Sequence, residues 1–289
     1  MIQSDKINAF TNSEERVVIC KDHLVSNEDF EIVKFKDGIL KTYPVPYNLS
    51  SYYESQDYIS HNDSSRGLQN KIYQIVKSHM LSKKANWIKK YFSNGTILDY
   101  GAGTGDFLNT MKKLLWNVEG VEPNKTARSL GVLKGLNLKS DISKLENSNY
   151  DVISLWHVLE HIPDFDTKIS KFYELLQENG LLVIAVPNYK SYDSEYYKSD
   201  WAAWDVPRHL WHFSRSGIKS VMENLGFELM EEKPLKFDSY YVSLLSERNK
   251  ENGGNVLNAF YRGYISNLRA KSSGEYSSVV YFFKKTLKT

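Results

Sequence analysis

The sequence predicts an α/β fold, in which a mostly parallel sheet carries helices on both faces and follows a small β-rich appendage. From residue 96 onward, short apolar runs alternate with helical stretches, as is typical of strand–helix–strand units. The run GLLVIAVP at 180–187 is almost entirely apolar, as expected for a strand buried on both faces. A glycine-rich turn at 101–105 joins the first of these runs to a helix.

The β-rich appendage is predicted at residues 1–60. It contains three strand-like pieces, RVVIC, FEIVKF and ILKTYPVP. Asp37-Gly38 lies between the last two pieces and favours a hairpin turn, and Pro44 and Pro46 end the last one. Residues 64–92 follow with apolar side chains at helical spacing, and Asn94-Gly95 ends this predicted helix.

The second predicted unit spans residues 61–289. Its strands are TILDY, NVEGVE, YDVISLW, GLLVIAVP, GFELMEEKP and YSSVVYFFKK. Its helices are predicted at 106–115, 124–133, 166–176 and 215–225, with Asn124 as an N-cap. An insertion at about 239–275 breaks the alternation with polar loops and one helix-like piece, VLNAFYRGYISNLRA. The apolar face of that piece either packs internally or contacts a partner.

Composition excludes several classes of protein. Of 289 residues, 37 are Lys or Arg and 35 are Asp or Glu, so a net charge of +2 predicts neither a nucleic-acid nor a membrane partner. The single Cys excludes an internal disulfide framework. The longest apolar run, 181–186, is too short to span a bilayer, and the start MIQSDKINAF does not resemble a signal peptide. We therefore expect a cytoplasmic protein.

The glycine turn carries the sharpest functional signal. Gly101, Gly103 and Gly105 follow a strand directly and suit a tight turn that a ligand approaches closely. A dinucleotide fingerprint reads G-x-G-x-x-G, whereas here Asp106 stands at the place of the last glycine. An acid at this helix start disfavours a pyrophosphate and suits a ligand with an ammonium group. The turn therefore favours an adenosine ligand without phosphates, although a purely structural turn remains the alternative.

Two acids follow the next two strands. Glu122 ends the second strand, where a doubly wound fold places a carboxylate for ribose hydroxyls. Asp141 follows the third strand and suits an adenine amino group, with Ile142 covering the ring. Each acid taken alone is equally compatible with an ordinary solvated residue. As an ordered set after successive strands, they predict a nucleoside site.

The runs ILDYGAGTGDFL, VEGVEPN, SDI, YDVISLWHVLEHIPD and GLLVIAVPN resemble class I S-adenosylmethionine-dependent methyltransferases. The resemblance covers about residues 96–190 and is greatest to the small-molecule branch that includes ubiquinone-type and sugar methyltransferases. It implies a Rossmann-like, doubly wound, mostly parallel seven-stranded sheet. The cofactor-binding residues that it implies are Asp99, Gly101, Ala102, Gly103, Glu122, Pro123, Asp141, Ile142, Trp156 and His157.

No metal site is predicted. Some relatives begin with a zinc ribbon of four cysteines, but here Cys20 stands alone and Lys21, Asp22 and His23 do not rebuild four ligands. His157 to His161 matches the H-x-x-E-H spacing of a zinc-peptidase class, but Pro163 leaves room only for a short helical turn. These histidines are therefore predicted to form local hydrogen bonds.

The segment SDWAAWDVPRHLWHFS at 199–214 is predicted to be a long loop beside the ligand edge of the sheet. A methyl acceptor must lose a proton, and histidine titrates near neutrality, which suits that role. Arg208-His209 resembles a recurrent pair of the methyltransferase family, and this resemblance implies His209 as the base. Trp204, Arg208 and His212 are predicted substrate-binding residues. The alternative is an aromatic lid that only packs. Tyr52, Tyr53 and Tyr58 either face the sulfonium or pack the appendage.

The predicted function is S-adenosylmethionine-dependent transfer of a methyl group to O, N or C of a small molecule, such as a sugar or secondary metabolite. The product would be S-adenosylhomocysteine, and the chain would be a monomer or homodimer. The alternative is a non-catalytic module that binds S-adenosylmethionine or S-adenosylhomocysteine and acts through a protein partner. A nicotinamide-dependent oxidoreductase is disfavoured by Asp106 and by the glycine spacing.

Overall fold

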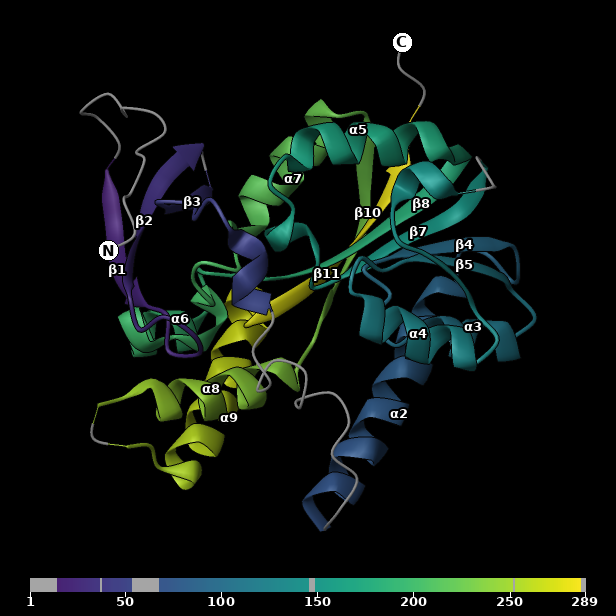
Figure 1. The fold of residues 1–289 in the computed structure, drawn as a ribbon. Coiled ribbons are helices and arrows are strands. Elements are labelled where there is room, and N and C mark those ends of the chain that lie inside the picture. The colour runs from purple at the N-terminus through teal and green to yellow at the C-terminus, as the bar shows by residue number, and fades with distance from the viewer. Residues whose placement is uncertain (1–14, 37, 54–67, 146–148, 252, 287–289) are drawn as a thin grey trace.

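Two sheets organise the molecule (Figure 1). The computed structural model describes residues 15–36, 38–53, 68–145, 149–251 and 253–286. The larger sheet has seven strands in the order β10-β11-β8-β7-β4-β5-β6. Five neighbouring strands, β8, β7, β4, β5 and β6, are parallel to one another. Strand β11 lies between β8 and β10 and is antiparallel to both. The strands are β4 (Thr96–Tyr100), β5 (Asn117–Val121), β6 (Asn137–Lys139), β7 (Tyr150–Trp156), β8 (Leu176–Pro187), β10 (Phe227–Pro234) and β11 (Ser278–Lys285). The predicted fold class is confirmed.

Helices cover both faces of this sheet because successive strand residues point to opposite sides. Ile97, Val152 and Leu181 point to one side and share a core with α2 (Leu68–Ile88) and α3 (Asp106–Lys113). Their neighbours in sequence, Leu98, Ile153 and Leu182, share the opposite core with α5 (Phe165–Leu175) and α7 (Arg215–Asn224). The apolar runs in the sequence are nearly continuous because these strands are buried on both faces of the sheet.

The predicted N-cap residue marks the start of helix α4 (Lys125–Leu133) correctly. Asn124 precedes α4, and its side chain accepts a hydrogen bond from the Ala127 N–H at 3.0 Å. This confirms the predicted cap. The predicted helix over 64–92 is α2, which ends at Ile88, and residues 64–67 lie outside the described ranges. None of the helices described crosses the threshold of length and apolarity that a membrane span requires.

The second sheet has the order β1-β2-β3-β9, and all its neighbouring strands are antiparallel. Its first three strands, β1 (Arg16–Lys21), β2 (Asp29–Lys36) and β3 (Ile39–Tyr43), match the strand-like pieces in the appendage. Residues 1–14 and 54–60 of that appendage, with Tyr58, lie outside the described ranges.

The fourth strand of this sheet, β9 (Trp211–Phe213), comes from the second predicted unit. Ile39 pairs with Phe213 and Lys41 with Trp211, so the sheet crosses the proposed boundary at residue 60. The prediction of a continuous loop at 199–214 is therefore wrong at its end. A three-residue strand is too short to show an alternating pattern, and its partner lies far away in the sequence.

The insertion consists of two helices, α8 (Asp238–Asn249) and α9 (Val256–Ser273), which pack on each other beside the short α6 (Tyr192–Tyr197). The first helix replaces a predicted polar loop. Its buried residues are polar, so the helix shows no hydrophobic periodicity in the sequence. They are Ser239, Ser243, Ser246 and Glu247.

The apolar face of α9 points to solvent. Of the two predicted alternatives, internal packing is therefore wrong for this face. Leu257 is 80% exposed, and Phe260 and Tyr264 are each 56% exposed. The buried face carries small residues instead, Ala259, Gly263, Ser266 and Ala270. A Cβ at Gly263 would come within 2.8 Å of the Tyr240 backbone, so glycine allows the two helices to approach closely.

Within the described ranges, five short 3-10 turns lie between these elements. They are η1 (Leu49–Tyr53), η2 (Ile142–Lys144), η3 (Leu159–His161), η4 (Lys198–Asp200) and η5 (Ala202–Trp204). The η3 turn confirms that the H-x-x-E-H segment does not form a full helix. It follows β7 directly and so lies at the carboxyl edge of the large sheet.

Candidate functional site

The carboxyl ends of three adjacent strands bring the predicted cofactor residues together. Strand β4 lies between β5 and β7, and Asp99 is in register with Gly120 on one side and Ser154 on the other. The glycine turn after β4, Glu122 after β5 and Trp156 at the end of β7 therefore share one edge of the sheet. Ligands of open α/β sheets bind at this edge.

The glycine turn has the backbone that only glycine adopts readily. Gly101, Gly103 and Gly105 have φ angles of 77°, 54° and 76°. The Gly101 and Ala102 N–H groups both donate to the Val121 carbonyl, at 2.8 and 3.0 Å, which fixes the turn against β5. A Cβ at Gly101 would lie 2.4 Å from a Val158 methyl group, whereas a Cβ at Gly103 would meet nothing within 4 Å. Gly103 is thus the place where a ligand can approach the backbone.

Glu122 connects the turn to the second strand. Its two carboxylate oxygens accept hydrogen bonds from the Gly103 N–H at 2.8 Å and the Asn124 N–H at 2.7 Å. Burial raises the pKa of Glu122, and these two hydrogen bonds oppose the shift. A carboxylate has about four acceptor positions, so Glu122 retains capacity for two ligand hydroxyls.

The remaining residues of the predicted adenosine end lie nearby on the surface. Asp141 is exposed and accepts a hydrogen bond from the Ser143 N–H at 2.8 Å, and bonding with Ser143 lowers the pKa of Asp141. Pro123 is exposed as well, whereas Ile142 is half-buried against the core. Asp141 thus both caps η2 and presents a charged carboxylate to solvent.

Asp99 and the ring nitrogen of the half-buried Trp156 are shielded from solvent at this edge. Asp99 is buried and accepts a hydrogen bond from the Ser154 hydroxyl at 2.6 Å, and burial raises the pKa of Asp99 to about 7. The Trp156 ring nitrogen is buried and has no hydrogen-bond partner among the described residues. Lys84 of α2 lies 4.2 Å from the centre of the Trp156 ring. Sequence reasoning missed Lys84, because nothing distinguishes it from other lysines on a helix.

Asp106 does not present an uncompensated charge at the start of α3. Lys77 and Lys134 approach its two carboxylate oxygens at 2.7 and 2.6 Å. The charge of Asp106 therefore does not by itself exclude a phosphate, contrary to the sequence argument. The glycine spacing remains as the difference from a dinucleotide fingerprint.

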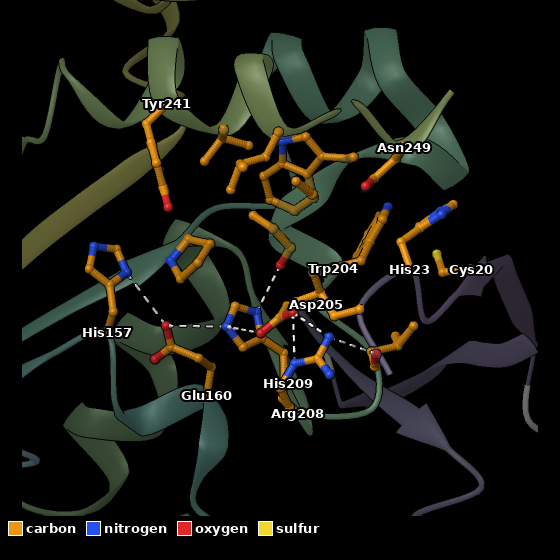
Figure 2. Close-up of a pocket in the computed structure, with 18 of the residues that line it drawn as sticks. Cys20, His23, His157, Glu160, Trp204, Asp205, Arg208, His209, Tyr241 and Asn249 are labelled. Atoms are coloured by element: carbon orange, nitrogen blue, oxygen red, sulfur yellow. Dashed lines mark hydrogen bonds and ion pairs between the residues drawn. The ribbon is translucent and has the colours of Figure 1, made fainter. Parts of the chain in front are cut away.

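A pocket of about 670 Å³ opens beyond His157 (Figure 2). Its wall is contributed by η3, the segment 199–209, helix α8, and the end of β1 with the turn that follows it. Trp204 and Arg208, predicted to bind substrate, and His209, the predicted base, line it, whereas His212 is not among the lining residues. His157, predicted to lie beside the cofactor, lines it as well. Glu160, Asp205, Asp238 and Tyr241 also line it and were not predicted as site residues.

His209 is held in one tautomer at the inner end of this pocket. Its Nδ1 lies 2.8 Å from the Ala203 carbonyl, which can only accept, so we assign the proton to Nδ1. The unprotonated Nε2 lies 4.0 Å from a Glu160 oxygen and 3.8 Å from an Asp205 oxygen. Figure 2 shows the His209 ring between these carboxylates. This is the arrangement of a base whose charged form two acids would stabilise.

Arg208 and His212 have structural partners. The Arg208 guanidinium is buried and donates to Asp22 at 3.1 Å and to Asp205 at 2.7 Å. His212 is bonded through Nε2 to the Thr42 hydroxyl at 2.9 Å, and burial lowers the pKa of His212 well below its usual value. Both side chains thus join the segment 205–212 to the N-terminal sheet.

His157 links the cofactor edge to α8. Its backbone has a φ of 58°, and its Nε2 lies 3.1 Å from an Asp238 carboxylate oxygen. Burial would lower the pKa of His157, but Asp238 and Glu160 raise it to about 9. The pKa of the neighbouring His161 shifts in the opposite direction: burial and the charge of His209 lower it to about 4. Asp238 gave no signal in the sequence, since its partner is distant along the chain.

Comparison with known proteins gives a consistent result. The sequence model of a family described as a methyltransferase domain matches residues 76–232, which is more than half of the chain. A ubiquinone biosynthesis O-methyltransferase of Hydrogenovibrio crunogenus is 26% identical over an alignment of 123 residues, and the match covers 38% of this chain and 51% of that protein. An uncharacterized methyltransferase of Bacillus cytotoxicus is 28% identical over 120 residues, 39% of this chain and 56% of that protein. The chain thus spans about half the length of these curated relatives.

Among solved structures, magnesium protoporphyrin IX methyltransferase from Synechocystis with bound SAH has a similar fold. The TM-score is 0.54 at 12% sequence identity, and the match covers 82% of this chain and 97% of that chain. At this identity the likeness concerns the fold alone. It supports the assignment of the seven-stranded sheet to the Rossmann-like class.

Proposed function

The chain belongs to the methyltransferase domain family, and from this premise we propose that it transfers a methyl group from S-adenosylmethionine to a small-molecule acceptor. Bound S-adenosylmethionine supplies an electrophilic methyl group on a sulfonium centre. The observation that carries the proposal is the adjacency of two features. The glycine turn and Glu122 lie at one sheet edge, and His157 connects this edge to the pocket that holds His209.

The residues at the edge fit this cofactor. Gly103 leaves open space where a larger residue would present a side chain, and the Glu122 carboxylate has acceptor positions left for ribose hydroxyls. Asp141 and Ile142 suit the adenine ring, and Asp99 and Trp156 suit the methionine end. The unpartnered Trp156 ring nitrogen is a buried donor for a ligand acceptor at that end.

The pocket residues would bind, orient and deprotonate the acceptor. Trp204 and the apolar side chains of α8 form walls that exclude water, and a volume of about 670 Å³ suits a molecule of drug-like size. His209 Nε2 takes the acceptor proton, and Asp205 and Glu160 stabilise the resulting imidazolium. Holding the acceptor in line contributes a further part of the rate.

Oxygen is the acceptor atom that we favour among O, N and C. A hydroxyl group must lose its proton during transfer, which suits a histidine base, and one of the curated relatives is named as an O-methyltransferase. A hydroxylated ring compound, such as a sugar or another secondary metabolite, would fit the mixture of apolar walls and a polar inner end.

The first test is a thermal-shift titration with S-adenosylmethionine, S-adenosylhomocysteine and NAD. A ligand at a hundred times its dissociation constant adds about 2.7 kcal/mol of stability, which raises Tm by a few degrees. We expect a shift with the two sulfur ligands, no shift with NAD, and loss of the shift in Glu122→Ala. The acceptor screen then measures release of S-adenosylhomocysteine, which His209→Gln should reduce at least a hundredfold. Binding of NAD alone would refute the proposal.

A further inference from the structure

Three metal-ligand side chains converge at the inner end of the pocket. Glu160 and His161 belong to η3, and His209 belongs to the segment before β9. One ligand atom from each lies within 4.8 Å of the other two. Two hydrogen bonds hold the two segments together: the Leu210 backbone N–H donates to the Glu160 carbonyl at 2.8 Å, and the Trp211 ring nitrogen donates to the Ile162 carbonyl at 2.8 Å.

Both histidines turn an unprotonated nitrogen away from the backbone. His209 Nδ1 lies 2.8 Å from the Ala203 carbonyl. His161 Nδ1 lies 3.0 Å from the Arg208 carbonyl and 3.1 Å from the Tyr53 hydroxyl, which donates to the same carbonyl at 3.2 Å. A carbonyl only accepts, and a hydroxyl that donates elsewhere can accept, so we assign the proton to Nδ1 in both rings, and each Nε2 keeps its lone pair. Metal-ligating histidines typically donate their other N–H to a backbone carbonyl in this way.

Glu160 supplies a buried carboxylate that lacks a close hydrogen bond. Its side chain is 1% exposed, and neither carboxylate oxygen has a hydrogen-bond partner among the described residues. The nearest imidazole nitrogens are His157 Nδ1 at 3.5 Å and His209 Nε2 at 4.0 Å, beyond good hydrogen-bond length. Burying a carboxylate without close hydrogen bonds is costly, and a cation nearer to it than these imidazoles would reduce that cost.

We propose that Glu160, His161 and His209 bind a divalent transition-metal ion such as Zn²⁺, Mn²⁺ or Fe²⁺. Two imidazole nitrogens and one carboxylate suit these ions, whereas Ca²⁺ and Mg²⁺ prefer oxygen ligands throughout. Three protein ligands leave coordination positions open towards the pocket. The H-x-x-E-H spacing pairs His157 with His161, but in the structure His157 is bonded to Asp238, and His209 joins Glu160 and His161 in the cluster.

The inference deepens the proposed methyl transfer and rests on it for its chemical consequence. An acceptor hydroxyl oxygen bound at an open metal position would lose its proton to solvent, because a divalent ion lowers the pKa of a bound hydroxyl. The oxygen anion then forms a bond to the methyl carbon as the carbon–sulfur bond breaks. The anionic and sulfonium charges cancel, and the products are a methyl ether and a neutral thioether. In the metal-bound protein His209 is a ligand, and the metal replaces it in activating the acceptor.

The test is a calorimetric titration of the EDTA-stripped full chain with Zn²⁺, with Co²⁺ absorption as a second readout of nitrogen ligation. We expect one ion per chain, and Glu160→Gln, His161→Gln and His209→Gln should each weaken Zn²⁺ affinity at least tenfold. The matched control is His23→Gln, an exposed histidine on the outer wall of the same pocket, which should leave the affinity unchanged. S-adenosylhomocysteine titration of every variant reports folding and the cofactor site.

The outcomes separate this inference from the proposed function. Absence of Zn²⁺ binding in a chain that binds S-adenosylhomocysteine overturns the metal site alone. Metal binding without S-adenosylhomocysteine binding overturns the proposed function alone. Equal weakening in His23→Gln, or unchanged affinity in the three cluster variants, would mean adventitious binding and overturn the site. If one cluster variant fails to fold, the two remaining variants decide.

Discussion

Gly101 and Gly103 are two residues apart in one turn, yet their surroundings differ. Both have positive φ angles, so an L side chain is strained at either position. At Gly101 the added Cβ also meets Val158, which belongs to the protein's own packing. At Gly103 the space is open, and on the proposed function it belongs to the cofactor. Gly101 is therefore required for packing, whereas on the proposed function Gly103 is required for cofactor binding.

We predict that Gly101→Ala lowers the free energy of unfolding by about 2 kcal/mol or more, whereas Gly103→Ala costs about 1 kcal/mol from backbone strain alone. Gly103→Ala should nevertheless weaken S-adenosylhomocysteine binding at least tenfold. Urea denaturation and calorimetry on both variants measure the two effects. Normal ligand affinity in Gly103→Ala would show that the open side of the turn is not where the cofactor lies.

At the scale of elements, helix α8 is tied to the sheet edge by the pair of His157 and Asp238. The pKa of His157 is raised to about 9 from an ordinary value of 6.5. A raised histidine pKa stabilises the folded state fully below pH 6.5, and this contribution disappears as the pH rises through 9. Because the His157 side chain is 35% exposed, solvent screening reduces the contribution to about 1 kcal/mol.

We predict that the free energy of unfolding falls between pH 7 and pH 10 in the native chain, and that Asp238→Asn lowers it at pH 7 and flattens this dependence. Denaturant titrations across the range measure it. The matched control is Asp166→Asn, which removes an exposed acid from the first turn of α5 and should leave the slope unchanged. An unaltered slope in Asp238→Asn would place the titrating group elsewhere.

At the scale of the whole molecule, the N-terminal sheet is joined to the methyltransferase fold by a strand and by a buried ion pair. Strand β9 completes the sheet, and Arg208 donates to the fully buried Asp22. Removing one partner of a buried pair leaves an uncompensated charge, which costs about 3–5 kcal/mol. An exposed pair in the same sheet, Arg16 with Glu31, is worth at most about 1 kcal/mol.

We therefore predict that Arg208→Leu lowers the free energy of unfolding by about 3 kcal/mol or more and that Arg16→Leu changes it by less than about 1 kcal/mol. Adding Asp22→Asn to Arg208→Leu should recover part of the loss, because it removes the buried charge. Denaturation followed by tryptophan fluorescence should show one transition, since the sheet and the fold share β9. Two separate transitions would instead support the division at residue 60.

The sequence by itself determined what depends on neighbours along the chain. The alternation of apolar runs and helices, the Asn124 cap and the glycine turn are local patterns, and the structure contains each of them. The carboxyl-edge placement of Glu122 also followed, because parallel strands carry their ends to one side. These inferences needed only the hydrophobic periodicity of the sequence, the residue types at turns and the direction of the strands.

Tertiary structure alone decided which distant side chains meet. It placed β9 beside β3, packed α8 through a stripe of serines, and directed Arg208 to Asp22. It also brought His209 to Glu160 and His161, where the sequence had paired His161 with His157. The physical reason is that burial and long-range hydrogen bonds select these partners, and neither leaves a periodic signal in the chain.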